Sequence, residues 1–263
     1  MDVGFVGAGR MGAPMISRLV AAGHSVRAVG RTDEKRAAAA QLGATPVSEI
    51  AEAVTGADAV IVCVFTDDQV RELCLDGPLV EAMAPGAALV LHTTGSPRTA
   101  QAIAARFGHV DVVDAPVSGG PHDIAAGSVT LFVGGSDDAV ARLTPLLGAY
   151  ADPVLHAGET GAGQLVKLVN NTLFAAQIGL VAEGTRLGTR FGISEGPLLN
   201  ALTHGSAQSR VLSMIASAGS ADAFIAAVGE FIGKDVAVVR KTVAELGGDL
   251  GPLDAVVRAG APS

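Results

Sequence analysis

Short apolar runs alternate with amphipathic segments over the first 158 residues of the chain. Runs of strand length, rich in β-branched residues, occupy residues 3–6, 25–29, 59–65, 88–92, 110–114, 129–133 and 153–156. Helical patterns lie between them, at residues 13–22, 33–42, 67–75, 97–107 and 137–147. Because strands and helices alternate in this way, we predict an α/β domain built on a doubly wound parallel sheet.

The pattern changes near Gly158. Residues 163–191 contain no proline, and their apolar residues recur at helical spacing, which predicts one long helix. The remaining residues also have a helical pattern, with sparse charges and many Ala and Gly residues that suit close helix packing. We therefore expect two domains, residues 1–158 and an all-α domain over residues 159–263, with a ligand in the cleft between them.

The first predicted strand leads directly into the hexapeptide Gly7-Ala8-Gly9-Arg10-Met11-Gly12. A Gly-x-Gly-x-x-Gly sequence between a strand and a helix indicates a dinucleotide-binding turn. In such a turn we expect Gly7 to allow the tight bend, Gly9 to leave room for a pyrophosphate and Gly12 to let helix and strand pack closely. The first domain is therefore expected to be a Rossmann domain. A glycine-rich turn with no ligand is the alternative.

Composition and charge narrow the possible partners. The chain has 263 residues, 49% of them hydrophobic, and a formal net charge of -8, which argues against nucleic acid or an anionic membrane as a partner. The apolar runs have strand length and not membrane-spanning length, and a strand that begins at Val3 leaves no room for a targeting peptide. Because Cys63 and Cys74 are the only cysteines, we expect reduced thiols, a cytoplasmic location and neither a disulfide framework nor a metal site.

The residues after the second strand bear on the choice of cofactor. An NAD site usually has an acidic residue here for the ribose 2′-OH, but Gly30 stands at that position. Arg31 and Thr32 follow, and a cation with a hydroxyl suits a 2′-phosphate. Asp33 is a possible ribose ligand, although it better resembles a first-turn charge of the next helix. The pattern favours NADP, with NAD as the second possibility.

The long helix contains the candidate chemistry. Lys167 and Asn171 are four residues apart, so they project from the same helix face, which is otherwise apolar. A lysine and an asparagine on a buried face are costly unless they meet a ligand or each other. The alternative is a lysine that extends to solvent beside asparagines that cap backbone groups.

Four segments together resemble the β-hydroxyacid dehydrogenase family, the 3-hydroxyisobutyrate dehydrogenase-like group. They are residues 4–15, 114–120, 161–171 and 234–235, in the order found in that family. The resemblance implies a Rossmann domain followed by an all-helical domain, and hydride transfer between a nicotinamide and a small β-hydroxy acid or semialdehyde acid. It also implies that Lys167 is the general acid and base and that Asn171 supports it.

The resemblance extends the set of candidate site residues. It implies that Ser118, Gly119 and Gly120 hold the substrate carboxylate, that Thr94 lies beside the nicotinamide and that Lys234 closes over the cofactor. The expected cofactor-binding residues are Gly7, Ala8, Gly9, Arg10, Met11, Gly12, Arg31, Thr32, Phe65, Thr94 and Lys234. The expected substrate-binding residues are Ser118, Gly119, Gly120, His122, Lys167 and Asn171.

The chain departs from the family pattern at three places. Residues 121–124 are Pro-His-Asp-Ile where related enzymes commonly have small residues, so His122 is either a substrate ligand or a solvent-exposed histidine. Arg210 is either a carboxylate clamp or a solvated arginine. The chain ends soon after Lys234, where family members usually continue into a further helix, so cleft closure and oligomer geometry stay open.

Two other functions remain as alternatives. An imine reductase has the same fold but usually lacks the catalytic lysine, and a non-catalytic dinucleotide-binding protein would not need Lys167, Asn171 and Lys234 together. A decarboxylating phosphogluconate enzyme needs a larger helical domain and more basic residues. We expect a small carboxylate-bearing aldehyde or hydroxy acid as the substrate, because residues 118–120 and Lys167 offer hydrogen-bond donors and one cation. A chain with 3% aromatic residues offers no aromatic cluster for a bulky hydrophobic substrate. The apolar helical domain predicts a homodimer.

Overall fold

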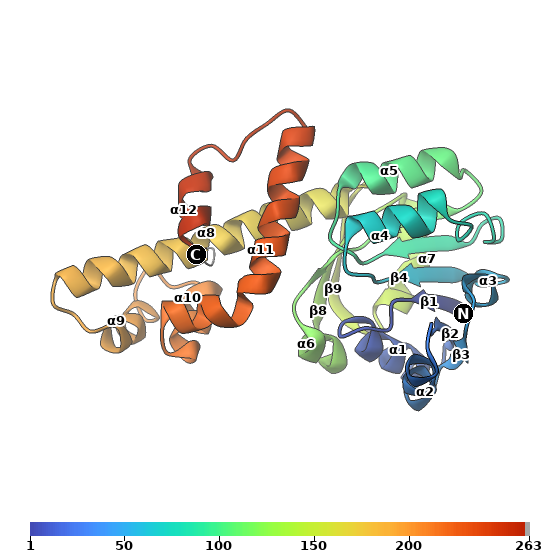
Figure 1. The fold of residues 1–263 in the computed structure, drawn as a ribbon, viewed down its shortest axis with the longest axis horizontal. Helices are drawn as coiled ribbons and strands as arrows, with labels where there is room; N and C mark the ends of the chain where they lie inside the picture. Colours follow the sequence, from blue (N-terminus) through green and yellow to red (C-terminus); the bar gives the residue numbers. More distant parts are fainter. Residues whose placement is uncertain (261–263) are drawn as a thin grey trace. The chain divides into compact units, whose positions relative to one another are not determined.

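The computed structural model describes residues 1–260, without the side chains of residues 230 and 231. The described chain divides into two compact units (Figure 1). The first comprises Met1–Lys167, and the second begins at Leu168. The division falls within a single long helix, α8 (Ala162–Arg190).

A nine-stranded sheet forms the centre of the first unit. Its strands are β1 (Asp2–Val6), β2 (Ser25–Val29), β3 (Thr45–Val47), β4 (Ala59–Val62), β5 (Ala88–Leu91), β6 (Asp111–Asp114), β7 (Val117–Ser118), β8 (Val129–Gly134) and β9 (Ala151–Gly158). The order along the sheet is β3-β2-β1-β4-β5-β6-β8-β7, and β9 pairs with β8. The six strands β1 to β6 are parallel and have the order 3-2-1-4-5-6 of a dinucleotide-binding domain.

Strand β8 departs from the expected parallel sheet. It runs antiparallel to β6 and β7, and β9 is parallel to β8, so the sheet is mostly parallel and not entirely so. Its antiparallel partner β7 (Val117–Ser118) is short, and the sequence pattern did not predict it. The three-residue β3 was missed as well. The other seven strands were predicted, with ends that differ by up to three residues.

Helices cover both faces of the sheet. They are α1 (Gly12–Ala21), α2 (Asp33–Gln41), α3 (Ile50–Val54), α4 (Asp67–Arg71) with a π-helical turn (Glu72–Asp76), α5 (Pro97–Arg106), α6 (Pro121–Ala126) and α7 (Asp137–Leu147). Strand β4 shows how the two faces are filled, because all four of its residues are buried. Ala59 and Ile61 join the core beneath α1 and α7, whereas Val60 and Val62 join the core beneath α3 and α5. Burial on both faces explains why this strand is continuously apolar.

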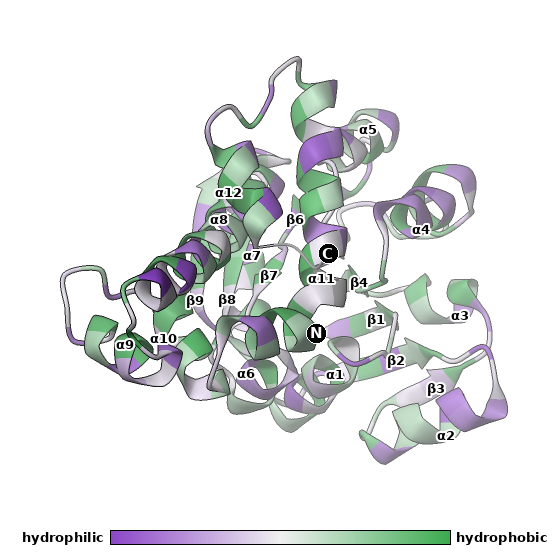
Figure 2. Cartoon of the chain, turned by 60° about the vertical axis from the view of Figure 1, so that its left-hand side comes forward, coloured by the Kyte–Doolittle hydropathy of each residue, from purple (hydrophilic) through white to green (hydrophobic). Residues whose placement is uncertain are grey.

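All regular elements in the described part of the second unit are helices. After α8 follow α9 (Glu195–Leu202), α10 (Arg210–Ala218), α11 (Ala221–Glu245) and α12 (Leu253–Ala259). Apolar and polar residues alternate along these helices (Figure 2), and their buried side chains form one core that includes Ile178, Leu212 and Ile215. Helix α12 approaches the backbone of α8 so closely that a Cβ atom on Gly179 would lie 1.9 Å from the carbonyl oxygen of Val256.

By length and composition, α8 is long and apolar enough to cross a membrane, and the bent pair α10 and α11 meets the same criterion together. Considering only uninterrupted apolar runs, we expected no segment of membrane-spanning length. Polar residues interrupt the apolar residues of α8, so this helix contains no such run, although it is apolar on average. The core helices of folded domains meet the criterion equally well. Half of the apolar stretch of α8 that meets the criterion is buried inside the protein, as in a core helix. The helix therefore gives no argument for a membrane.

A buried polar pair lies at the carboxyl edge of the sheet. His92, which follows β5, and Tyr150, which precedes β9, are both buried. The His92 Nδ1 atom lies 2.6 Å from the carbonyl oxygen of Ala115, and its Nε2 atom lies 2.7 Å from the Tyr150 hydroxyl. Nδ1 therefore donates to the carbonyl and Nε2 accepts from the hydroxyl, which is the pattern of a neutral imidazole. Burial lowers the pKa of His92 to about 4.

The lowered pKa of His92 predicts a loss of stability in acid. Between pH 6.5 and 4 the unfolded chain binds a proton at His92 that the folded chain does not, so the free energy of unfolding falls as the pH is lowered. The loss reaches about 3 kcal/mol near pH 4. His92→Asn lacks this titration. Urea unfolding from pH 7 to pH 4 should show the stability advantage of the wild type over His92→Asn shrinking, and a constant difference would contradict a buried neutral His92.

Candidate active site

The turn between β1 and α1 uses its three glycines in different ways. Gly7 has a φ of +106°, and a Cβ atom there would lie 2.2 Å from the carbonyl oxygen of Cys63. A Cβ atom on Gly12 would lie 2.1 Å from the carbonyl oxygen of Gly7. Gly9 differs, because a Cβ atom there would meet no heavy atom within 4 Å. The fold itself therefore requires Gly7 and Gly12, whereas the space beside Gly9 is open to a ligand.

The start of α1 also differs from the starts of its neighbours. No side chain caps its first turn, and none of its first-turn residues is acidic. Helices α2, α4, α5 and α7 each begin at a Thr or Ser whose hydroxyl accepts a backbone N–H. An uncapped helix start beside an open glycine is the arrangement that binds a phosphate group. The residues present at this turn therefore fit a dinucleotide.

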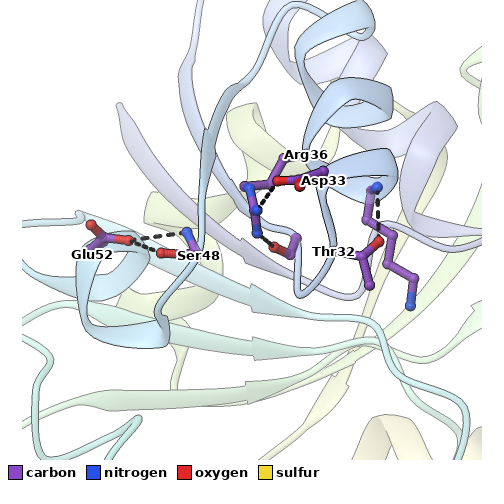
Figure 3. Close-up of polar contacts among 7 residues, drawn as sticks. Thr32, Asp33, Arg36, Ser48 and Glu52 are labelled. Carbon is purple, nitrogen blue, oxygen red and sulfur yellow. Dashed lines mark hydrogen bonds and ion pairs between the residues drawn. The ribbon is translucent and has the colours of Figure 1, made fainter.

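The end of β2 is closed to an acidic side chain (Figure 3). Arg36 donates to the carbonyl oxygen of Gly30 at 2.8 Å and forms an ion pair with Asp33. A Cβ atom on Gly30 would lie 2.8 Å from both Cγ and the backbone nitrogen of Arg36. Thr32 caps α2 by accepting the N–H of Lys35 at 3.3 Å, and its hydroxyl also hydrogen-bonds to Glu34, which lowers the pKa of that carboxyl. Asp33 therefore acts as a first-turn charge of α2, while Arg31 is exposed.

The neighbouring strand end is also polar. The backbone N–H of Gly30 donates to the carbonyl of Val47 in β3 at 2.9 Å. The next residue, Ser48, donates its backbone N–H and its hydroxyl to Glu52 at 3.1 and 3.3 Å (Figure 3). The Glu52 carboxylate is thereby bonded to the start of α3.

Two loops that follow β4 and β5 are bonded to each other. The Thr93 hydroxyl donates to the carbonyl of Val64 at 2.9 Å and accepts the N–H of Val64 at 3.1 Å. The Asp67 carboxylate accepts the N–H of Ser96 at 3.2 Å and the hydroxyl of Thr99 at 2.8 Å. The two loops therefore form one bonded unit at the carboxyl edge of the sheet.

The expected cofactor residues Thr94 and Phe65 lie in these two loops. Thr94 is buried, whereas 52% of Phe65 is exposed. The backbone N–H of Phe65 donates to the side chain of Gln69 at 2.9 Å, which fixes the loop at the start of α4. Neither residue is part of a regular element, and both take their positions from the loop contacts.

The segment Ser118-Gly119-Gly120 joins β7 to α6. Ser118 ends β7, and Gly119 has a φ of +137°. Gly120 donates its N–H to the Asp123 carboxylate at 2.6 Å. The imidazole of His122 also lies 3.1 Å from Asp123, and 86% of this side chain is exposed. The Gly120 N–H, expected to hold a substrate carboxylate, thus already has an acceptor, and His122 is exposed beside it.

A buried carboxylate holds the first turn of α8. Asp114, at the end of β6, is 0% exposed. It accepts the N–H of Gly161 at 2.5 Å and the N–H of Gln164 at 2.7 Å. Burial raises the pKa of Asp114 to about 6, and these hydrogen bonds act in the opposite direction. Lys167, one turn further along α8, is buried with 8% exposure.

The second unit contains the remaining candidates. Asn171 is buried, donates to the Asp235 carboxylate at 2.8 Å and accepts from Asn170 at 3.3 Å. Asp235 adjoins the half-buried Lys234 on α11. Arg210 is exposed at the first residue of α10.

Sequence reasoning assigned no role to Asp114, Gln164 or Asp235. All three lie within the segments that resemble the family, but only the fold shows what they contact. Asp114 does carry one local signal, since it is an acidic residue that ends a buried strand.

Family models match nearly the whole chain. Residues 2–158 match the model described as the NAD binding domain of 6-phosphogluconate dehydrogenase. Residues 161–259 match the model described as NAD-binding of NADP-dependent 3-hydroxyisobutyrate dehydrogenase. The chain belongs to the β-hydroxyacid dehydrogenase family. It is accordingly an NAD(P)-dependent oxidoreductase with a Rossmann domain and a helical domain.

Curated relatives and solved structures agree with this family. A probable 3-hydroxyisobutyrate dehydrogenase of Mycobacterium tuberculosis is 35% identical over 204 residues, which cover 76% of this chain and 68% of the relative. An NAD-dependent L-serine dehydrogenase of Pseudomonas aeruginosa is 36% identical over 195 residues, covering 73% of this chain and 65% of the relative. The solved structure of a Mycobacterium tuberculosis 3-hydroxyisobutyrate dehydrogenase with L-serine has a TM-score of 0.87 at 29% identity, covering 97% of this chain and 91% of the other.

An imine reductase of Streptomyces aurantiacus is similar in fold alone. Its TM-score is 0.69 at 20% identity, covering 99% of this chain and 93% of the other. The relatives above 30% identity that are described here are dehydrogenases. The comparisons therefore favour the hydroxyacid dehydrogenase over the imine reductase.

The open space beside Gly9 generates a prediction. Gly9→Ala should leave the melting temperature within about 2 °C of the wild type, because the added methyl group meets no protein atom. The same methyl group should weaken NADPH binding about tenfold or more, because it occupies the space proposed for the pyrophosphate. Fluorescence titration and thermal unfolding measure the two effects.

Gly108→Ala is the matched control, since a Cβ atom there also meets nothing within 4 Å and Gly108 lies outside the motif. Unchanged NADPH affinity in Gly9→Ala would contradict a pyrophosphate site at this turn.

Proposed function

We propose that the protein reduces small semialdehyde acids with NADPH, and oxidises the matching β-hydroxy acids in reverse, with Lys167 as general acid and base. The observation that carries the proposal is a buried lysine on α8, in a helix whose first turn is fixed to the carboxyl edge of the sheet by Asp114. Burial disfavours the charged form of an ammonium group, which suits a lysine that both gives up and takes back a proton.

The reaction assigns a clear role to the lysine. When bound, a nicotinamide would supply a hydride to the carbonyl carbon of the substrate, and the carbonyl oxygen would become an alkoxide that needs a proton. The ammonium of Lys167 donates that proton, and in the reverse direction the neutral amine accepts the proton of the hydroxyl. Asn171 lies one turn further along α8, where its amide donates to Asp235, and we assign it a supporting role for the lysine.

The proposed carboxylate site consists of Ser118 and Gly119 together with Gly120. Ser118 offers a hydroxyl, and the φ of +137° at Gly119 turns the backbone so that N–H groups can converge on an anion. The N–H of Gly120 becomes available only if the Asp123 carboxylate releases it. These donors suit one carboxylate, so we favour short acids such as succinic semialdehyde, glyoxylate and 3-hydroxyisobutyrate. His122 and Arg210 are candidates for a second anionic group.

The preference for NADP rests on the end of β2. Arg31 and Thr32 offer a cation and a hydroxyl to the 2′-phosphate, and Arg36 covers Gly30 where an acidic ribose ligand would stand. The remaining proposed cofactor residues are the glycine-rich turn from Gly7 to Gly12, Phe65, Thr94 and Lys234. Reduced cysteines and a cytoplasmic location are consistent with such an enzyme.

Arg31 provides the test of cofactor preference. Arg31→Ala should weaken NADPH binding by about tenfold and change NADH binding little, because only NADPH presents the 2′-phosphate. Isothermal titration with both cofactors measures this. Arg190→Ala, which removes another exposed arginine at the end of α8, is the charge-matched control. Equal weakening of both cofactors would count against the assignment.

Lys167 provides the test of the chemistry. Lys167→Ala should lower kcat by about 10²- to 10⁴-fold while the Kd for NADPH stays within about threefold of the wild type, because the lysine acts on the substrate and not on the cofactor. Steady-state kinetics and fluorescence titration measure the two quantities. Lys241→Ala, at an exposed position of α11, serves as the control. Retention of most activity in Lys167→Ala would remove it from the catalytic role.

We also propose that the protein is a homodimer whose interface includes α8. Apolar side chains of large size are exposed along this helix and just beyond its end, namely Val169, Leu173, Leu180, Leu187 and Phe191. Their separations of four, seven, seven and four residues place them on one side of the helix. A monomer would leave this apolar surface in water, and a second copy of the chain offers a matching one.

Light scattering at micromolar concentration tests the dimer. The wild type should have the mass of two chains, and Leu180→Glu should shift it toward one chain by placing a charge in the interface. Leu246→Glu is the control, because Leu246 is similarly exposed but does not lie on α8. A monodisperse wild-type monomer would contradict the proposal.

A further inference from the structure

We propose that Gln164 is a positioning residue that holds Thr94 at a fixed distance from Lys167. The proposal rests on the proposed function, in which Thr94 lies beside the nicotinamide and Lys167 acts on the substrate. Nothing in the sequence pattern assigns Gln164 a role. Its contacts do so, because it is a polar side chain with 2% exposure at the start of α8.

The amide of Gln164 bonds to the backbone on both sides of Thr94. Its Oε1 atom accepts the N–H of Gly95 at 2.9 Å. Its Nε2 atom donates to the carbonyl oxygen of Thr93 at 2.8 Å. Thr94 lies between these two bonded residues and is itself buried. One side chain therefore fixes the peptide groups that set the position of Thr94.

The same residue is fixed to the helix that carries the lysine. Gln164 and Lys167 are three residues apart on α8, so they are neighbours on its surface. The backbone N–H of Gln164 is held by the Asp114 carboxylate at 2.7 Å, which prevents this turn of the helix from sliding. One turn of α8 and the side-chain amide of Gln164 thus connect Lys167 to the loop that contains Thr94.

The far side of the loop is already held by Asp67 and Val64, through Ser96 and Thr93. With Gln164 in place, the loop is bonded on both sides. Removing the amide would release the side that faces α8 and leave the other side bonded. Such a change alters the position of Thr94 without unfolding the loop.

A primary amide is the side chain that suits both contacts, because one needs an acceptor and the other needs a donor. Gln164→Met keeps the length and volume of the side chain and removes both hydrogen bonds. Gln164→Glu keeps an acceptor for the N–H of Gly95 and loses the donor for Thr93. The two variants therefore form a graded pair.

Kinetics measure the effect on chemistry. Gln164→Met should lower kcat for reduction of a semialdehyde acid by about tenfold or more, with the KM of the substrate and the Kd of NADPH within about threefold of the wild type. Gln164→Glu should lie between Gln164→Met and the wild type. Gln101→Met is the matched control, because the side chain of Gln101 donates to the carbonyl oxygen of Thr160 at 3.3 Å, outside the loop that contains Thr94. It should leave kcat unchanged.

Amide hydrogen exchange gives a readout that does not need activity. In the protein without cofactor, Gln164→Met should speed exchange of the Gly95 N–H about tenfold or more, whereas Gln101→Met and the amides of β1 serve as unchanged references.

A lower kcat together with faster exchange at Gly95 supports the proposal. Faster exchange with unchanged kcat overturns the positioning role, and unchanged exchange overturns the contact itself. A wild type inactive on every acid would refute the proposed function, and therefore the positioning role, while the exchange result still decides whether Gln164 holds the loop.

Discussion

The buried carboxylate of Asp114 bonds the end of a sheet strand, β6, to the start of the long helix α8. It ends β6 and accepts the N–H groups of Gly161 and Gln164 around the start of α8, so the helix begins directly at the carboxyl edge of the sheet. The approach is close, since a Cβ atom on Gly163 would lie 2.3 Å from the carbonyl oxygen of Phe132. Because Lys167 lies one turn from this junction, its position follows from that of Asp114. An ion buried in this way is tolerable only because backbone donors surround it.

The loops at the same edge are held by side chains from other elements before any ligand binds. Thr93 bonds the loop after β4, Asp67 bonds the loop after β5 at Ser96, and Gln164 bonds that loop from α8. Catalysis of hydride and proton transfer depends on reacting groups held in place, and hydrogen bonds formed on folding meet that need without a cost at binding. The turn at Gly9 is different, because there the structure leaves space.

Much of this arrangement could be predicted from local patterns. The long helix was expected over residues 163–191 and occupies Ala162–Arg190, because a period of 3.6 residues that persists over so many positions is specific to a helix. The turn from Gly7 to Gly12 was equally clear, since its glycines stand between a strand and a helix. Short elements such as β3 and β7 were missed, because two or three residues carry no period. The direction of β8 is not a local property either.

The contacts that hold the site could not be predicted in this way. Asn171 and Asp235 are 64 residues apart in sequence, and Gln164 bonds residues that precede it by 69 and 71 positions. No pattern within one helix shows what its buried polar side chains meet. The Gly120 N–H illustrates the same point, since a nearby carboxylate three residues later takes the donor that the motif suggested for a substrate.

The most direct test of the account compares one substrate with and without its charge. Purified wild-type protein is given NADPH and either succinic semialdehyde or its methyl ester, and oxidation of the cofactor is followed by absorbance. The account predicts that kcat/KM for the acid exceeds that for the ester by about tenfold or more, because the donors at Ser118 and Gly119 lose their charged acceptor in the ester. Faster turnover of the ester, or of a cyclic imine, than of every carboxylate tested would contradict it.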